Sequence, residues 1–110
     1  MDNVSNTKTV IDGITFDSKK EAKRYSELKL LEKAGLIGSL QLQIKYELVP
    51  SQKGGIKTEQ AINYVADFVY YDLSKYSAPM IIEDVKGKTT PVYIIKRKLM
   101  KLNGFEVTET

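Results

Sequence analysis

The chain has 110 residues, the size of one ordinary domain, and it can bury a core without disulfides or a structural metal. Hydrophobic residues make up 42% of it and charged residues 28%, a globular composition. Because the chain has no Cys and no His, a zinc site is disfavoured, and catalysis by a thiolate or an imidazole is excluded. Carboxylates, lysines, tyrosines and hydroxyls remain, and carboxylates bind hard cations such as magnesium. The net charge of +3 is compatible with a polyanionic partner but does not identify one.

The longest apolar stretches are far shorter than the roughly 20 residues that span a bilayer. The first six residues lack the basic start and apolar run of a secretory signal. We therefore expect no membrane association and a cytoplasmic location. Residues 1–110 are predicted to form a single domain, with residues 1–6 disordered.

Two β-branched runs within residues 9–16 are joined by Asp12-Gly13, which predicts a tight hairpin. Ser18 with Glu21 forms a capping box for a helix that runs to about Ala34, where Gly35 ends it. One stripe of this helix is expected to face the core: Ala22, Tyr25, Leu28 and Leu31.

Apolar and polar residues alternate from Leu40 to Val49, which predicts a half-buried strand. A polar, glycine-bearing connection follows at 51–57, most simply a flexible hairpin loop whose lysines could touch phosphate. The segments 61–71 and 80–86 are dense in Val, Ile, Phe and Tyr, as is typical of central strands covered on both faces.

Thr89 or Thr90 is expected to cap a helix that begins at Pro91, and Gly104 should end it. A last strand is predicted over 105–108. The fold class is therefore α/β in the wider sense (α+β): an N-terminal hairpin, a helix, a three-stranded meander, a helix and a strand, with a mixed central sheet. The predicted buried stripe of the last helix consists of Val92, Ile95, Leu99 and Leu102.

The chemistry is concentrated in the two central strands. Asp67 lies in an otherwise apolar strand, where an unpaired carboxylate is costly or shifts its pKa. Since side chains alternate along a strand, Asp84 and Lys86 should share one face of the next strand while Glu83 points to the other. If Asp67 pairs beside Asp84, two carboxylates and an ammonium converge, which suits Mg²⁺ and metal-assisted phosphodiester hydrolysis.

Asp67 followed by Asp84-Val85-Lys86 resembles the signature of the PD-(D/E)xK, or restriction-endonuclease-like, nuclease superfamily. The order of elements resembles that core as well. More closely, residues 16–22, 64–68 and 83–87, together with Thr90, Tyr93, Lys96 and Lys98, resemble a phage-encoded family of small endonuclease-like domains similar to Holliday junction resolvases. The resemblance runs from about Thr7 to the end of the chain. Ala66 stands where that signature often has Pro.

The resemblance implies a Mg-dependent endodeoxyribonuclease, with Mn as an alternative metal, that cuts branched or junction DNA in phage recombination or replication. The location would then be the host cytoplasm. Junction cutting would favour a homodimer, although no apolar surface in the sequence proves an interface. The implied metal ligands are Asp67, Asp84, the Val85 carbonyl and an auxiliary Glu21, with Lys86 as the catalytic lysine. The implied phosphate contact is Lys96 or Lys98, and Lys88 and Lys53 are further candidates for binding nucleic acid.

Simpler interpretations exist for these residues. A single buried acid such as Asp67 is often satisfied by a lysine or by backbone donors, and Glu21 is also the capping-box acid. A basic run on a helix is commonly a solvated face, and a half-buried Tyr is usually packed with its hydroxyl bonded. The alternative functions are therefore a catalytically silent DNA-binding module of the same fold, or an acid cluster that only organises the core.

Overall fold

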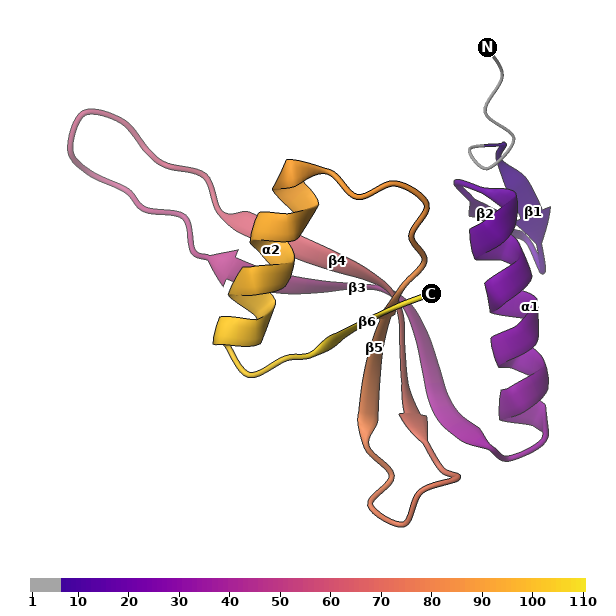
Figure 1. Cartoon of the computed structure of the whole chain (residues 1–110). Coiled ribbons are helices and arrows are strands. Elements are labelled where there is room, and N and C mark those ends of the chain that lie inside the picture. Colours follow the sequence, from indigo (N-terminus) through magenta and orange to yellow (C-terminus); the bar gives the residue numbers. More distant parts are fainter. Residues whose placement is uncertain (1–6) are drawn as a thin grey trace.

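The computed structural model describes residues 7–110, and its elements follow the predicted order of hairpin, helix, meander, helix and strand (Figure 1). The predicted disorder of residues 1–6 lies outside the described residues. Strands β3 to β6 form a mixed sheet in the order β3-β4-β5-β6, in which only the β5–β6 pair is parallel. The α+β fold class is therefore confirmed. The elements are β1 (Thr9–Ile11), β2 (Ile14–Phe16), α1 (Lys19–Lys33), β3 (Ile37–Val49), β4 (Ile62–Asp72), β5 (Met80–Asp84), α2 (Pro91–Leu102) and β6 (Val107–Glu109).

Turn and cap residues set the local structure as the sequence predicts. Asp12 and Gly13 both have positive φ, 54° and 76°, as a two-residue hairpin turn with the twist of the strands requires. Ser18 caps α1 by accepting a hydrogen bond from the backbone N–H of Glu21 at 3.1 Å. Thr90 caps α2 in the same way, and Pro91 occupies its first turn.

Two hydrophobic cores lie on opposite faces of the sheet, one under α1 and the N-terminal hairpin and the other under α2 (Figure 1). Neighbouring residues of β5 contribute to different cores: Ile81 packs on the α1 side and Ile82 packs on the α2 side. This separation is the alternation expected of a strand that is covered on both faces.

The long β3–β4 ribbon contributes to both cores. Leu42 and its partner Phe68 pack on the α1 side, whereas Ile44 and its partner Ala66 pack on the α2 side. In a flat strand these alternate residues would share one face, so the ribbon must twist strongly between them. Gln43, with a φ of 54°, lies at this changeover on β3.

The buried face of α2 differs from the predicted stripe. Val92, Ile95 and Leu102 are 61%, 58% and 80% exposed. Tyr93 and Met100 are buried instead. The prediction was wrong because the helix presents a different face to the sheet: Tyr93 and Met100, with the partly buried Ile94, pack into the core, and Glu109 satisfies the Tyr93 hydroxyl. Strand β5 also ends at Asp84 rather than at the predicted 86.

The helices between residues 7 and 110 are all too short or too polar to cross a membrane.

Glu83 of β5 is completely buried beneath α1, and four donors satisfy it. Arg24 donates from Nε at 2.6 Å and from Nη2 at 3.0 Å, Tyr70 donates its hydroxyl at 2.6 Å, and Thr110 donates at 3.0 Å. Burial by itself would raise the pKa of Glu83, but the hydrogen bonds from Arg24 and Tyr70 more than offset it and hold the pKa below its ordinary value. This ion pair joins α1 to the sheet.

Arg24→Met should destabilise the protein by about 3 kcal/mol, because it leaves a buried carboxylate without its charged partner. Combining it with Glu83→Leu should recover part of the loss. Lys29→Met, which breaks the exposed Lys29–Glu32 pair, is the matched control and should cost less than about 1 kcal/mol in urea unfolding. Equal losses for Arg24→Met and Lys29→Met would contradict this account.

Candidate active site

A cleft of about 410 Å³ opens between the sheet and the first turn of α2, and we call it the acid cleft. Strand β4 supplies Asp67 to it, the end of β5 supplies Asp84, and Lys86 follows two residues later. Glu21 reaches the same cleft from the first turn of α1. The four predicted catalytic side chains therefore line one cavity.

The register of β4 and β5 places Asp67 beside Asp84. Phe68 pairs with Glu83, so the next step of this antiparallel ladder sets the two aspartates opposite each other on the face away from Glu83. The backbone N–H of Val85 donates to Asp67 Oδ2 at 2.8 Å, and the hydroxyl of Tyr64 donates to Asp84 Oδ2. Both carboxylates are thus held in place by donors from the neighbouring strand.

Lys86 is fixed at the rim of the cleft by contacts on three sides. Its ammonium lies 3.3 Å from Asp84 Oδ2 and 3.8 Å from the centre of the Tyr93 ring. Its backbone N–H donates to the carbonyl of Thr110 at 2.9 Å, which continues the β5–β6 ladder past the end of β5. The terminal strand therefore orients the lysine.

The two aspartates repel each other when both are charged. Burial raises the pKa of Asp67 to about 8, assisted by a hydrogen bond to Asp84 and by the charge of Asp84, while the Val85 N–H opposes the rise. The pair therefore holds a proton near neutral pH. Perturbed acids of this kind occur preferentially at functional sites.

Glu21 is 9% exposed and accepts a hydrogen bond from Gln43 Nε2 at 3.3 Å. Only one half of the predicted capping box is thus present, because the Glu21 carboxylate turns toward the cleft instead of back to Ser18. Burial raises the pKa of Glu21, and the charges of Asp17 and Asp84 add to the rise. Lys86 acts in the opposite direction.

The donors in the cleft suit a hard cation. Within residues 7–110 no three acidic side chains converge tightly enough to form a ready-made metal site. Magnesium, however, typically takes only one or two carboxylates and fills its remaining positions with water and substrate phosphate. Asp67 and Asp84 meet that requirement, and the proton retained by their pair is one that a cation would displace. Val85, the implied carbonyl ligand, also lines the cleft.

The predicted phosphate contacts are dispersed. Lys96 lines the acid cleft, whereas Lys98 is exposed elsewhere on α2. Lys88 is exposed in the connection between β5 and α2. Lys53 is exposed in the β3–β4 connection, outside the cleft. Of the four lysines, only Lys96 is brought to the acids.

Three residues to which the sequence analysis gave no catalytic or metal-binding role also build the site. Tyr64 bonds Asp84, and Tyr93 lies against Lys86 while donating its hydroxyl to Glu109 at 2.6 Å. The ammonium of Lys20 donates to the backbone carbonyl of Lys86. Strand alternation predicts that Tyr64 and Asp67 lie on opposite faces of β4. The hydrogen bond from Tyr64 to Asp84 could therefore not be predicted from the sequence, because it depends on the twist of the ribbon. The position of Lys20 next to Glu21 was its only signal.

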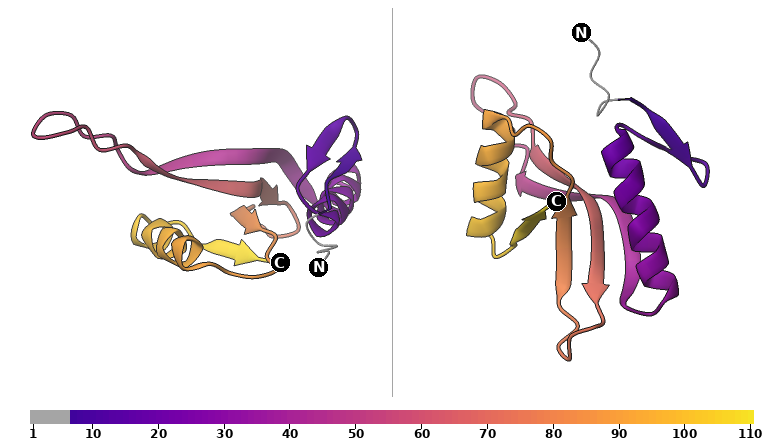
Figure 2. Two further views of the ribbon diagram at one scale, coloured as in Figure 1. Left: turned by 90° about the horizontal axis from the view of Figure 1, so that it is seen from above. Right: turned by 45° about the vertical axis from the view of Figure 1, so that its right-hand side comes forward.

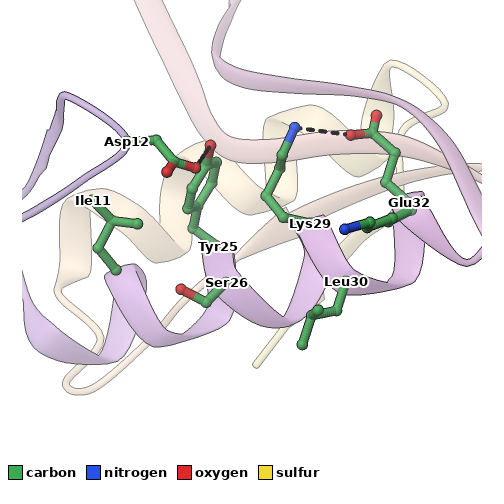
Figure 3. A pocket seen from close by; sticks show the side chains of 8 residues that line it. Ile11, Asp12, Tyr25, Ser26, Lys29, Leu30 and Glu32 are labelled. Atoms are coloured by element: carbon green, nitrogen blue, oxygen red, sulfur yellow. Dashed lines mark hydrogen bonds and ion pairs between the residues drawn. The ribbon is translucent and has the colours of Figure 1, made fainter.

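A larger hollow of about 550 Å³ lies between the N-terminal hairpin and α1 (Figure 3). Its polar groups largely satisfy one another, since Tyr25 donates to Asp12 at 2.9 Å and Lys29 pairs with Glu32 at 3.1 Å. Leu30 and Ile11 also line it. Because it lacks the converging acids of the acid cleft, we do not assign the chemistry to it.

The protein is thus an α+β protein with a cleft formed by two aspartates and a lysine. It belongs to the family described as Protein of unknown function (DUF1064), which matches residues 1–110. Searches of curated proteins and of solved structures gave no significant match.

In the metal-free protein the raised pKa of Asp67 should make stability depend on pH. The folded state binds the extra proton between roughly pH 4 and pH 8, so the free energy of unfolding should fall as the pH rises through this window. Asp67→Asn cannot ionise and should exceed the parent in stability at pH 8 by several kcal/mol, since one pKa unit corresponds to about 1.36 kcal/mol.

Urea unfolding with EDTA across this pH range measures the effect. Glu59→Gln, in the exposed β3–β4 connection, is the control and should keep the slope of the parent. If Asp67→Asn also kept that slope, another group would be responsible for it.

Proposed function

We propose that this protein is a metal-dependent DNA endonuclease that hydrolyses phosphodiester bonds, with branched or junction DNA as its substrate. The observation that supports this most strongly is the convergence of Asp67, Asp84 and Lys86 in one open cleft. An acid cluster with a purely structural role would not require an ammonium at a solvent-accessible rim. Glu83, on the opposite face, illustrates such a structural acid, since donors surround it completely.

Each residue has a distinct role in this proposal. Asp67 and Asp84 would hold the cation, assisted by the Val85 carbonyl and, as an auxiliary acid, Glu21. When bound, a divalent cation polarises the scissile phosphate and favours ionisation of a bound water. Lys86 orients the attacking water and offsets the charge that develops on the phosphate.

The reaction is a hydrolysis that needs no further reactant. The oxygen of water bonds to phosphorus, one bridging P–O bond breaks, and the leaving oxygen takes up a proton. Tyr64 and Tyr93 act as positioning residues, because Tyr64 bonds Asp84 and Tyr93 lies against Lys86. Lys96 binds a phosphate next to the scissile one.

The substrate class rests on the resemblance to PD-(D/E)xK nucleases and to small phage-encoded domains similar to Holliday junction resolvases. The order of elements in the fold is compatible with that superfamily. Mg²⁺ is the proposed metal and Mn²⁺ an alternative, and phage recombination or replication in the host cytoplasm is the proposed setting. A homodimer would supply the two cuts that a junction requires.

Asp67→Asn, Asp84→Asn and Lys86→Ala should each reduce cleavage at least about a hundredfold, the scale on which losing one charge-stabilising group acts in other enzymes. Glu21→Gln should have a smaller effect. Labelled junction, flap, single-stranded and duplex DNA with Mg²⁺ or Mn²⁺ are the test substrates. Glu106→Gln, an exposed change outside the cleft, is the control. Cleavage unchanged by the two aspartate variants, or absent on every substrate, would refute the proposal.

A second candidate is a catalytically silent DNA-binding module. It is favoured by the internal satisfaction of the acids, because Asp84 already pairs with Lys86 and Asp67 already accepts from Val85.

Titration calorimetry separates the two functions. The nuclease should take up Mg²⁺ or Mn²⁺ with release of protons near pH 7, and Asp67→Asn should abolish that release. The silent module should give no metal heat and should bind DNA equally with and without metal.

A further inference from the structure

The connection between β3 and β4 forms an arm that extends past α2 and away from both cores (Figure 1 and the left view of Figure 2). We define the arm as residues 50–60, all of which are exposed. A bridge between Gln52 and Glu59, with hydrogen bonds of 2.9 and 2.8 Å, keeps its two sides paired. The radius of gyration is 16.2 Å, compared with roughly 13 Å for a compact chain of this length. The arm is thus a long two-stranded ribbon that buries little surface against the rest of the protein.

The tip of the arm combines charge with an exposed apolar side chain. Gly54 and Gly55, both with positive φ, make the turn, and Ile56 next to them is fully exposed. Lys53 and Lys57 flank the turn, and neither forms an ion pair within residues 7–110. Two free cations around a solvent-exposed Ile suit the major groove of duplex DNA, whose edges are lined by anionic phosphates and whose floor offers the thymine methyl as an apolar contact among polar base edges.

The arm is continuous with the acid cleft. Asn63 and Val65 of β4 line the cleft, and the arm leads directly into this end of β4. A two-stranded ribbon fits the major groove of DNA, which is about 12 Å wide. From Asn63 to Gly55 the chain spans at most roughly 26 Å at about 3.3 Å per residue, the length of some seven or eight base pairs.

We propose that the arm is a DNA-contacting ribbon that lies in a groove of the duplex beside the cleavage site, with Lys53 and Lys57 on phosphates and Ile56 against the bases. The proposal rests on the proposed nuclease function for its substrate, and it adds where the flanking duplex lies.

The β4–β5 hairpin provides a matched control. It lies at the opposite end of β4, and its turn carries Lys75 and a fully exposed Tyr76 (Figure 1). It therefore has the same kind of side chains without adjoining the cleft.

The first test measures DNA affinity as a function of salt, with Ca²⁺ in place of Mg²⁺ to prevent turnover. Lys53→Gln with Lys57→Gln should weaken binding roughly tenfold to a hundredfold near 0.1 M salt and should lower the salt slope by about 1.8, since each phosphate contact contributes about 0.9. Ile56→Ser should weaken binding without changing the slope. Lys75→Gln with Tyr76→Ser should leave both unchanged. Because the arm is exposed, unchanged circular dichroism and urea unfolding should accompany these variants.

The second test uses the absence of native Cys. Ile56→Cys and Tyr76→Cys each create one thiol, which can carry a photoactivated crosslinker. Position 56 should crosslink to DNA within about eight base pairs of the cut site, and position 76 should not. Comparable crosslinking from both positions, or arm variants that bind like the parent, would overturn the inference.

The outcomes separate the two proposals. If the parent cleaves DNA and the arm variants bind as the parent does, the arm proposal fails and the nuclease proposal stands. If the parent binds through the arm but does not cleave, the nuclease proposal fails and the arm proposal stands. If the parent binds no DNA, both fail. Crosslinking of the arm to a second copy of the chain instead of DNA would identify a protein interface and refute the arm proposal.

Discussion

The twist of the β3–β4 ribbon is the constraint on which the rest of the structure depends. One row of its side chains packs under α2 as far as Ala66 and under α1 from Phe68 onward. Asp67 lies between these two residues, where the ribbon passes from one core to the other. An acid in the middle of a buried strand is normally costly. At this changeover it can reach a cleft, so the same twist that joins the two cores also creates the opening for the acids.

The adjacent acids of β5 show how surroundings decide the role of a carboxylate. Glu83 faces α1, where donors from Arg24, Tyr70 and Thr110 stabilise its charged form and lower its pKa. Asp84 faces the cleft, where it crowds Asp67 and contributes to raising the pKa of that residue. The first arrangement ties a helix to the sheet. The second keeps a pair of carboxyl groups in a state that favours exchange of a proton for a cation.

Helix α2 packs on the sheet through Tyr93 and Met100 and also contributes polar contacts to the site. Tyr93 lies against Lys86, and Glu109 of β6 accepts from the Tyr93 hydroxyl at 2.6 Å and from Arg97 at 2.9 Å. The face that carries Tyr93 and Met100 is turned inward, which leaves Val92 and Ile95 exposed. The last strand therefore fixes both the helix and the lysine, so the geometry of the cleft depends on a segment far from the acids in sequence.

Local sequence determined the order of elements, the Asp12-Gly13 turn, the Ser18 cap and the alternation that places Asp84 and Lys86 on one face. These features depend on neighbours a few residues apart, which is why periodicity and turn chemistry predict them. Tertiary structure alone decided which face of α2 is buried, that Tyr64 and Lys20 join the site, and that only Lys96 among the four lysines predicted to bind nucleic acid lines the cleft. Those outcomes depend on the twist of the sheet and on polar partners that are distant in sequence. Neither can be predicted from hydrophobic periodicity.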